Sequence, residues 1–275
     1  MNTSHLKSQF SVAKGLLLVV ALLATTLTAY SQPSIRSVSV DGTQFRVMTS
    51  DSKILPQGTL PGTVISFGDG QGHRRSLRID AVERDARDRS GETILYTFSE
   101  QDAAGAGWHN ICDADPDGRR LGFPLGGSFS SDMRYTASAD RVAIVCTAGA
   151  EGKCIRFGYK PWARAPDGSS LAPYYQTCLR LVRADYLGNG VGHTQNGVPI
   201  DIFDRIGVQK DEVAPGMTLE AAWGPDGALC VRHTRLANDP PLEDLARQSS
   251  HLFDLVGRAC DDAHAGLLFD RSFEP

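Results

Sequence analysis

The stretch "CLRLVRADYLGNG", residues 178–190, decides the fold because it ends the clearest helical pattern in the chain. From Leu171 onward the apolar residues recur at a helical spacing, which predicts one amphipathic helix. Its buried face would carry Tyr174, Cys178, Leu181, Val182 and Asp185. Gly188 predicts a left-handed C-cap that ends this helix. A carboxylate and two arginines at such a helix end form either a catalytic group or a structural lock.

The sequence before this helix has a different pattern of polar and apolar residues. Between residues 34 and 146, polar and apolar residues alternate, and turn dipeptides interrupt the pattern, which is typical of antiparallel strands. Two hairpins are predicted, in "SIRSVSVDGTQFRV" and "TVISFGDGQGHRRSLRIDAV". Further strands are predicted in "ETILYTFSE", "RRLGFPLGG" and "DRVAIVCT". Residues 34–146 should therefore form an antiparallel sheet or a partial barrel.

Residues 147–275 mix helices and strands. A short helix is expected near Ala150, and a strand in "VPIDIFD". A hairpin in "LEAAWGPDGALCVRHTR" should turn at residues 225–227. Acidic residues open the last helix, "PLEDLARQSSHLFDLVGRAC". No linker composition separates the halves, so we predict a single α+β unit over residues 32–275 with two main helices.

Residues 1–31 resemble a secretory signal peptide. Lys7 and Lys14 are the only Lys, Arg, Asp or Glu residues, an apolar run follows, and residues 29–31 form a small-x-small ending. We predict cleavage after Ser31 and an uncleaved anchor as the alternative, since the apolar run is near the lower limit for a membrane span. No second apolar run of that length follows. The mature chain should then lack a transmembrane segment and act in the periplasm or outside the cell.

The charge balance excludes some partners. The formal net charge is −4, and loss of a leader with two lysines and no acidic residue makes the mature chain more acidic still. An acidic chain is a poor ligand for nucleic acids and anionic membranes. We therefore predict no nucleic-acid partner.

Six cysteines follow the predicted leader, at positions 112, 146, 154, 178, 230 and 260. An even count behind an export signal predicts three disulfides, with no choice among the fifteen connectivities. Structural zinc is the alternative, but there is no CxxC motif. We predict no cofactor.

Several ordered segments resemble the ADYC-domain family of exported bacterial proteins. They are "AIVCTAGAEGKCIRFGYKPW", "CLRLVRADYLGNG", "TQNGVPIDIFD" and "EAAWGPDGALCVRHTR". The resemblance covers roughly residues 108–230 and implies no particular reaction. The family is named for an Ala-Asp-Tyr-Cys motif, and this chain has Leu187 at the fourth position. If the family cysteine forms a disulfide, its partner should be missing here as well.

Two hypotheses concern the motif itself. A carboxylate at a helix C-terminus opposes the helix dipole, so Asp185 should have a cationic partner. Arg183, Arg180 and Lys160 are the candidates, and such a pair would fix the helix against "GYKPW". Arg183 and Tyr186 would then be structural as well. The catalytic alternative gives Asp185 an acid–base role beside His193.

Weaker patterns point to other sites. "DADPDG" repeats the start of a calcium loop with Asp113, Asp115 and Asp117, but the twelfth position is a proline. His109, His193 and His233 are scattered, and they would form a site only if the fold gathers them. Trp108, Trp162 and Trp223 are interpreted as core anchors, and a carbohydrate-stacking platform is the alternative. We expect a binding or interaction module for a protein or envelope component. The alternative is a secreted hydrolase using Asp185, His193 and Asp201.

Overall fold

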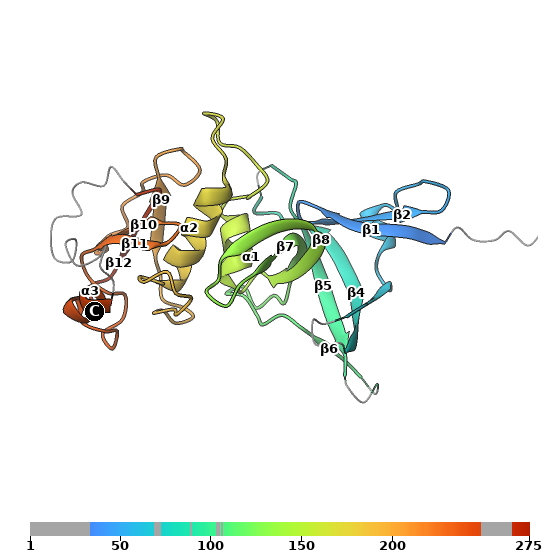
Figure 1. The fold of residues 1–275 in the computed structure, drawn as a ribbon, viewed down its shortest axis with the longest axis horizontal. Coiled ribbons are helices and arrows are strands. Elements are labelled where there is room, and N and C mark those ends of the chain that lie inside the picture. The colour runs from blue at the N-terminus through green and yellow to red at the C-terminus, as the bar shows by residue number, and fades with distance from the viewer. Residues whose placement is uncertain (1–33, 69–72, 89, 103–104, 106, 249–265) are drawn as a thin grey trace, which may run out of the picture. The chain divides into compact units, whose positions relative to one another are not determined.

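The computed structural model describes residues 34–275 apart from 69–72, 89, 103–104, 106 and 249–265 (Figure 1). Ser34–Pro275 cluster as one compact unit. The predicted signal peptide, Cys260 and the second part of the predicted last helix lie outside the described residues.

Antiparallel strands build the first half, as predicted. A two-stranded hairpin pairs β1 (Ile35–Asp41) with β2 (Gln44–Thr49). A short 3₁₀ turn, η1, covers Gln57–Thr59. The larger sheet runs in the order β3-β4-β5-β7-β8, with β6 paired to β5. Its strands are β3 (Val64–Gly68), β4 (Arg74–Arg84), β5 (Ile94–Gln101), β6 (Trp108–Asn110), β7 (Gly122–Phe129) and β8 (Tyr135–Cys146). Among the described strands the larger sheet does not close into a barrel, and the antiparallel sheet that was predicted is confirmed.

Burial follows the period-two pattern that predicted these strands. Strand β2 buries Phe45 and Val47 on one face and leaves the residues between them more exposed. Strand β5 is central and is buried on both faces. The rings of Tyr96 and Phe98 stack with centroids 5.3 Å apart, and Phe45 meets Tyr96 edge to face at 5.5 Å. This aromatic cluster fixes the hairpin onto the larger sheet.

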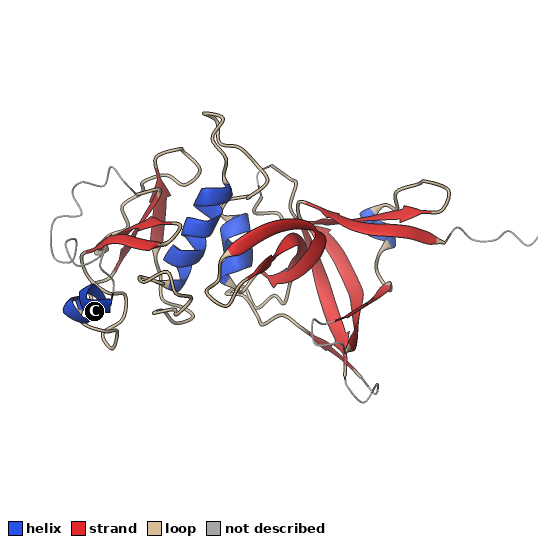
Figure 2. Cartoon of the chain, in the orientation of Figure 1, coloured by secondary structure: helices blue, strands red, loops and turns tan. Residues whose placement is uncertain are grey.

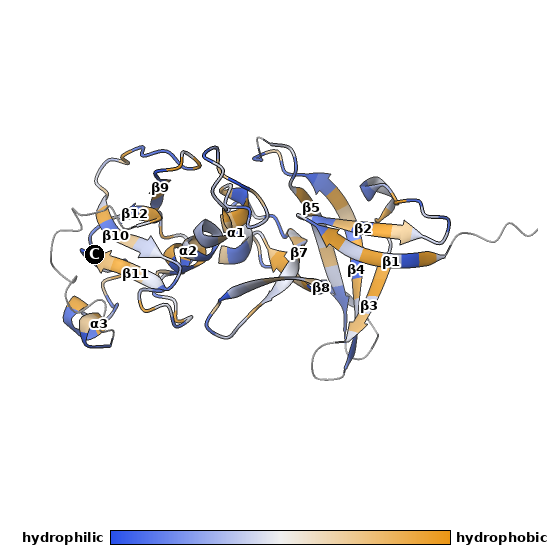
Figure 3. Cartoon of the chain, turned by 45° about the horizontal axis from the view of Figure 1, so that its top comes forward, coloured by the Kyte–Doolittle hydropathy of each residue, from blue (hydrophilic) through white to orange (hydrophobic). Residues whose placement is uncertain are grey.

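Not all apolar residues of this half are covered. Figure 3 shows hydrophobic residues on β1 and β3. Ile35 and Val38 on β1, with Val64 and Phe67 on β3, are all exposed. Single exposed apolar residues are common on soluble proteins.

Helices and a second sheet form the rest of the unit (Figure 2). The helices are α1 (Ala150–Arg156), α2 (Ala172–Arg183) and α3 (Leu242–Gln248). The second sheet has the order β11-β10-β12-β9. Its strands are β9 (Asp201–Asp204), β10 (Thr218–Gly224), β11 (Gly227–Val231) and β12 (Leu268–Ser272). Strand β12 was not predicted, because "LFDRS" is buried at four of its five positions and does not alternate. No helix among the described residues is long and apolar enough to cross a bilayer.

Disulfides stabilise both halves. Cys112–Cys146 ties the segment after β6 to the end of β8, and Cys154–Cys178 joins α1 to α2. Cys230 is disulfide-bonded too, and no cysteine in the described part of the chain is free. The prediction of a disulfide-stabilised α+β fold is therefore confirmed.

Helix α2 ends earlier than predicted. Ala184, not Gly188, is its left-handed C-cap, with φ of 48°. The Ala184 N–H donates to the carbonyl of Leu181, and the Asp185 N–H donates to that of Arg180. A non-glycine residue in this conformation costs about 1–2 kcal/mol, so tertiary contacts beyond the helix must hold it. Those contacts belong to the motif described next.

Candidate functional site: a buried ionic lock and two open pockets

Asp185 is fully buried and fully hydrogen-bonded. Its Oδ2 lies 2.6 Å from Nη1 of Arg180, and both side chains have no exposed surface. The backbone N–H groups of Asn189 and Gly190 donate to the same carboxylate at 3.1 and 2.9 Å. The carboxylate therefore closes the loop after α2 on itself and faces no solvent.

Arg180 extends this lock to two turns from other parts of the chain. Its guanidinium donates to the carbonyl oxygens of Pro225, in the β10–β11 turn, and Asp132, in the β7–β8 turn. The glycines of the motif allow the loop after α2 to approach the backbone of these two turns closely. A Cβ on Gly188 would lie 1.9 Å from the Asp226 carbonyl oxygen, and one on Gly190 would lie 2.7 Å from the Asp132 Cα. The motif therefore joins α2 to both sheets.

The other predicted partners of Asp185 have different roles. Arg183 donates to the Gly190 carbonyl at 2.6 Å. Lys160 is buried and pairs with Asp88 at 3.0 Å and with Glu92 at 3.1 Å. The expectation that the Asp185 pair fixes the helix against "GYKPW" is therefore wrong, because the pair is local to the helix end.

Tyr186 connects the motif to the second sheet. Its hydroxyl donates to Oε1 of Glu220 at 2.9 Å, and its ring stacks on Trp223 with centroids 5.3 Å apart. Trp223 in turn donates its indole N–H to Asp270 at 2.8 Å. All four side chains are fully buried. Leu187, at the position of the family cysteine, packs against the core.

Arg235 is the cation at the centre of this network. It pairs with Glu220 at 3.0 Å and with Asp270 at 2.6 Å. It also donates to the carbonyls of Leu181 at 3.0 Å and Val182 at 3.2 Å, at the end of α2. It therefore adds donors to the last carbonyls of the helix, where Leu181 otherwise accepts, among the described residues, only from the C-cap residue Ala184.

Two carboxylates share this one guanidinium. Burial, and next the charge of Glu220, raise the pKa of Asp270 well above its usual value. Burial alone would lower the pKa of Arg235, but Glu220 and Asp270 outweigh it and raise the pKa. Sequence reasoning missed this network. The one available signal was the presence of charged residues inside the apolar strand patterns of "LEAAW" and "LFDRS".

The three candidate catalytic residues have separate partners. His193 Nδ1 lies 3.5 Å from Asp239 Oδ1, and Asp201 Oδ2 lies 3.0 Å from Arg271 Nη1. Asp185 is closed off by Arg180. Asp201 lines an open pocket, and the lining of that pocket includes neither of the other two.

The acidic loop at residues 113–118 is stabilised by hydrogen bonds between its own residues and their neighbours. Asp115 is buried and accepts N–H groups from Asp117 and Arg119, each at 3.0 Å. Burial raises the pKa of Asp115, but these hydrogen bonds outweigh it and lower the pKa. Asp117 pairs with Arg87. The loop is therefore an Asx turn in which two of the three predicted calcium ligands have protein partners, and no partner of Asp113 is seen among the described residues.

The three scattered histidines also bind different groups. His109 lies 2.8 Å from Asp102, and Nε2 of His233 lies 3.0 Å from the Thr218 hydroxyl. Within the described residues, no group of three or more His, Cys, Asp or Glu side chains is placed to hold a metal ion.

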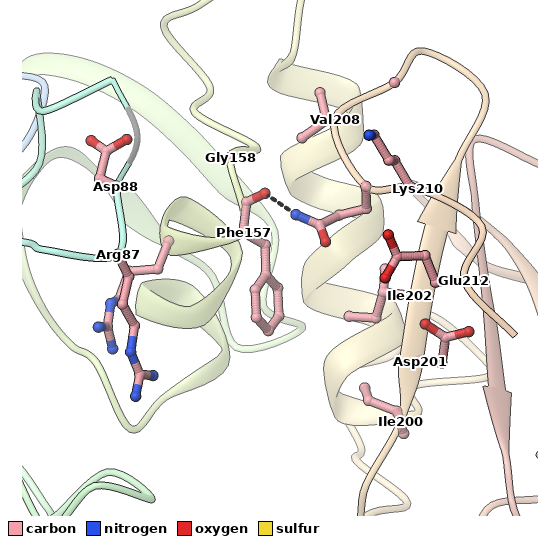
Figure 4. A pocket seen from close by; sticks show the side chains of 13 residues that line it. Arg87, Asp88, Phe157, Gly158, Ile200, Asp201, Ile202, Val208, Lys210 and Glu212 are labelled. Carbon is pink, nitrogen blue, oxygen red and sulfur yellow. Dashed lines mark hydrogen bonds between the residues drawn. The ribbon is translucent and has the colours of Figure 1, made fainter. Parts of the chain in front are cut away.

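The first open pocket, which we call the Phe157 pocket, has a volume of about 640 Å³. Figure 4 shows Arg87 on one wall, Phe157 in the middle, and Asp201 with Glu212 on the facing wall. The walls come from the β4–β5 loop, the end of α1, β9 and the β9–β10 loop. Gln209 bridges the walls by donating to the Phe157 carbonyl at 2.6 Å.

Asp204 fixes the rim of the Phe157 pocket. Its carboxylate accepts the backbone N–H groups of residues 206–209, at distances between 2.7 and 3.1 Å. The Tyr159 hydroxyl donates to the same carboxylate at 2.7 Å. The pocket is thus preformed on ordered elements, which favours ligand binding.

The second opening, which we call the Trp162 groove, has a volume of about 540 Å³. It lies where the β1–β2 turn, β7, β8 and the start of α2 meet. Trp162 is 43% exposed, so its interpretation as a core anchor is wrong. It follows Pro161 in a turn and packs on Gly42 rather than entering the core. Trp223 is fully buried in the core, and Trp108 lies half-buried under Arg78.

An open antiparallel sheet, a disulfide-bonded helix pair and an ionic lock at "RADY" together define a disulfide-stabilised α+β protein. Residues 57–237 match the ADYC domain. The match covers more than half of the chain, which therefore belongs to the ADYC-domain family. It extends on both sides of the expected range of 108–230. Neither the curated proteins nor the solved structures give a match to this chain.

Proposed function

We propose that this chain is an exported binding module and that its ADYC motif is structural. The observation that carries the proposal is the complete burial of the Arg180–Asp185 pair, with the carboxylate satisfied by three donors. A general acid or base must reach its substrate. Asp185 is closed to solvent on all sides, so its chemistry stays within the fold.

Two preformed openings support a binding role. The Phe157 pocket and the Trp162 groove, at about 640 and 540 Å³, fall within the range of about 300–1,000 Å³ common for ligand sites. Disulfides support export, because they persist in oxidising compartments. The expected partner is a protein or another component of the cell envelope.

The binding proposal is tested with the purified chain and envelope extracts. A binding module retains one component saturably and releases it unchanged. Variants at the two openings, Glu212→Gln and Trp162→Ala, locate the site, and Asp140→Asn on the exposed face of β8 is the control. Cleavage products that accumulate with time, or retention that never saturates, would contradict the proposal.

A secreted hydrolase is the second candidate, and one observation favours it. Asp201 and Glu212 both line the Phe157 pocket (Figure 4). Paired carboxylates carry out acid–base chemistry in most glycoside hydrolases. For this candidate, Glu212→Gln should abolish product formation and leave the melting curve unchanged, because Glu212 is exposed.

Export itself predicts a defined mature terminus. The ending at residues 29–31 places cleavage after Ser31, so the protein from its native host should begin at Gln32. Intact-mass measurement decides this directly. A released protein that keeps residues 1–31 would remove the signal-peptide interpretation.

A further inference from the structure

Trp162 is the most exposed tryptophan in the chain, and its position is fixed by the backbone. A Cβ added to Gly42 would lie 3.2 Å from Cζ2 of Trp162, so the ring packs directly on the β1–β2 turn. Gly42 has φ of 58°, which favours glycine there for a second reason. A large apolar ring held in place at 43% exposure presents a preorganised contact surface.

The walls around Trp162 are rigid and hydrogen-bonded. Oε1 of Gln176 accepts the Tyr135 N–H at 2.9 Å, and Nε2 of Gln176 donates to the Met133 carbonyl at 3.2 Å. The Tyr135 hydroxyl donates to the Gly126 carbonyl at 2.6 Å. The ring of Tyr135 also meets Tyr175 edge to face at 5.2 Å. A ligand in this groove would therefore meet a preformed surface.

The charge of the groove restricts its ligand. None of the residues that line it is a lysine or arginine. Its one ionisable carboxylate, Asp41, uses Oδ2 to pair with Arg46 at 2.7 Å. No hydrogen bond from a described residue reaches Oδ1 of Asp41, so this oxygen remains an acceptor for a ligand hydroxyl. Phosphates and polyanions meet no cation in the lining, and the nearby Arg46 is already paired with Asp41. A neutral hydroxyl-rich molecule is matched.

A sugar ring combines the two properties that this groove matches. One face of a pyranose presents C–H groups, which are attracted by the negative face of an indole ring. Its rim presents hydroxyls, which donate to a carboxylate. The neighbouring positions on β8, Ala137, Ser138 and Ala139, carry small side chains and leave the face of the groove open.

We propose that the Trp162 groove binds a neutral carbohydrate, with Trp162 as the stacking platform and Asp41 as the hydroxyl acceptor. This inference rests on the proposed binding function and names the ligand class. A proline-rich peptide is the main competitor, because polyproline helices also dock on exposed aromatic residues. The acceptor oxygen of Asp41 favours the sugar, since a polyproline segment has no N–H or O–H to donate.

Calorimetric titration of the purified chain with neutral β-glucan and chitin oligosaccharides tests this proposal. Binding should be saturable, and Trp162→Ala should weaken it at least tenfold. Trp162→Phe should restore part of the affinity, because a smaller aromatic face remains. Asp41→Asn should weaken it less. The control is Trp108→Ala, since Trp108 is a partly exposed tryptophan that does not line the groove.

The outcomes separate the two levels of the proposal. If no oligosaccharide binds at millimolar concentration, or if Trp108→Ala weakens binding as much as Trp162→Ala, the carbohydrate inference is overturned. Binding of decaproline in place of the sugars overturns it as well. If an envelope component is still saturably retained, the binding-module proposal stands without it, and if nothing is retained, both proposals fall. Melting curves of each variant show whether a loss of binding reflects unfolding.

Discussion

The two halves of this protein share one apolar core, but they differ in the groups that they bury at its centre. In residues 34–146 the core is an aromatic and aliphatic layer around β5, with Phe45, Tyr96 and Phe98 at its centre. In residues 147–275 the core encloses the pairs of Arg180 and Arg235 with their carboxylates. An apolar core tolerates changes of similar volume. A core of buried ions does not, because each charge depends on its partner.

Arg235→Ala should have the largest effect on this comparison. It leaves Glu220 and Asp270 without their cation and removes the Arg235 donors from two carbonyls of α2. We expect the free energy of unfolding to fall by at least the roughly 3–5 kcal/mol of a broken buried pair. Chemical denaturation measures this loss. Arg46→Ala, which breaks the exposed pair with Asp41, should cost less than about 1 kcal/mol. If the two variants lost equal free energy of unfolding, the buried network would contribute no more to stability than an exposed ion pair.

Asp185→Asn comes next. Oδ2 of Asp185 accepts from both Arg180 and Gly190, and Oδ1 accepts from Asn189. An asparagine has only one acceptor oxygen, so its amide NH2 would face at least one of these donors. We expect a loss of a few kcal/mol, near the roughly 3–5 of a broken buried pair, and any binding should fall only with the folded fraction. Thermal melting and titration on the same samples separate the two effects. Asp140→Asn is the matched exposed control. A normal melting curve with lost function would instead assign Asp185 a functional role.

Removal of the Cys154–Cys178 bridge tests a covalent element of the same half. Replacing both cysteines with alanine should cost about 2–5 kcal/mol, because the unfolded chain gains freedom. Urea denaturation of the oxidised proteins measures the difference. Thiol labelling of the denatured, unreduced wild-type chain should find essentially no free thiol. Two or more labelled cysteines would mean that at least one of the three predicted bridges is absent.

The pH dependence of stability should show the smallest effect, and the two halves should differ in sign. The folded state raises the pKa of Asp270, so its contribution is present below the unfolded value near 4 and is lost as pH rises. Asp88 behaves in the opposite way. Burial raises its pKa, but hydrogen bonds led by Lys160 outweigh burial and lower it, so its contribution is lost as pH falls below about 4.

The variant Asp270→Asn isolates the contribution of Asp270 to the pH dependence of stability. The stability difference between wild type and variant should favour wild type most near pH 4 and shrink as pH rises. Its slope is limited to about 1.4 kcal/mol per pH unit for one proton. Denaturant titrations between pH 4 and 8 measure it, with Asp140→Asn as the control. A difference that grows with pH would contradict the raised pKa of Asp270.

The contrast between the halves also explains what could be predicted from sequence. Strands such as β2 were predictable because alternation of Phe45 and Val47 with exposed residues is a local property. Three residues were candidates for the cationic partner of Asp185. Which of them pairs with Asp185 depends on where α2 ends, and the structure shows that it is Arg180. The end was placed wrongly at Gly188 because Ala184, a non-glycine residue, takes the left-handed conformation that ends the helix.

The candidate site was less predictable than the fold. Glu220, Asp270 and Arg235 lie far apart in the chain, and no spacing rule joins them. The Phe157 pocket and the Trp162 groove depend on loops whose relative positions are set by long-range contacts. Trp162 was recognised as notable, but its exposure is set by a contact with Gly42 that lies about 120 residues away in sequence.

The two described disulfides also bear on the order of assembly. Cys112–Cys146 spans 34 residues and Cys154–Cys178 spans 24, and the two loops follow one another without overlap. Each bridge can therefore close without waiting for the other or for residues beyond position 178. A chain that enters an oxidising compartment N-terminus first would have α1 and part of α2 crosslinked before Glu220, Arg235 and Asp270 arrive. The ionic network would then form last, on a template that is already covalently closed.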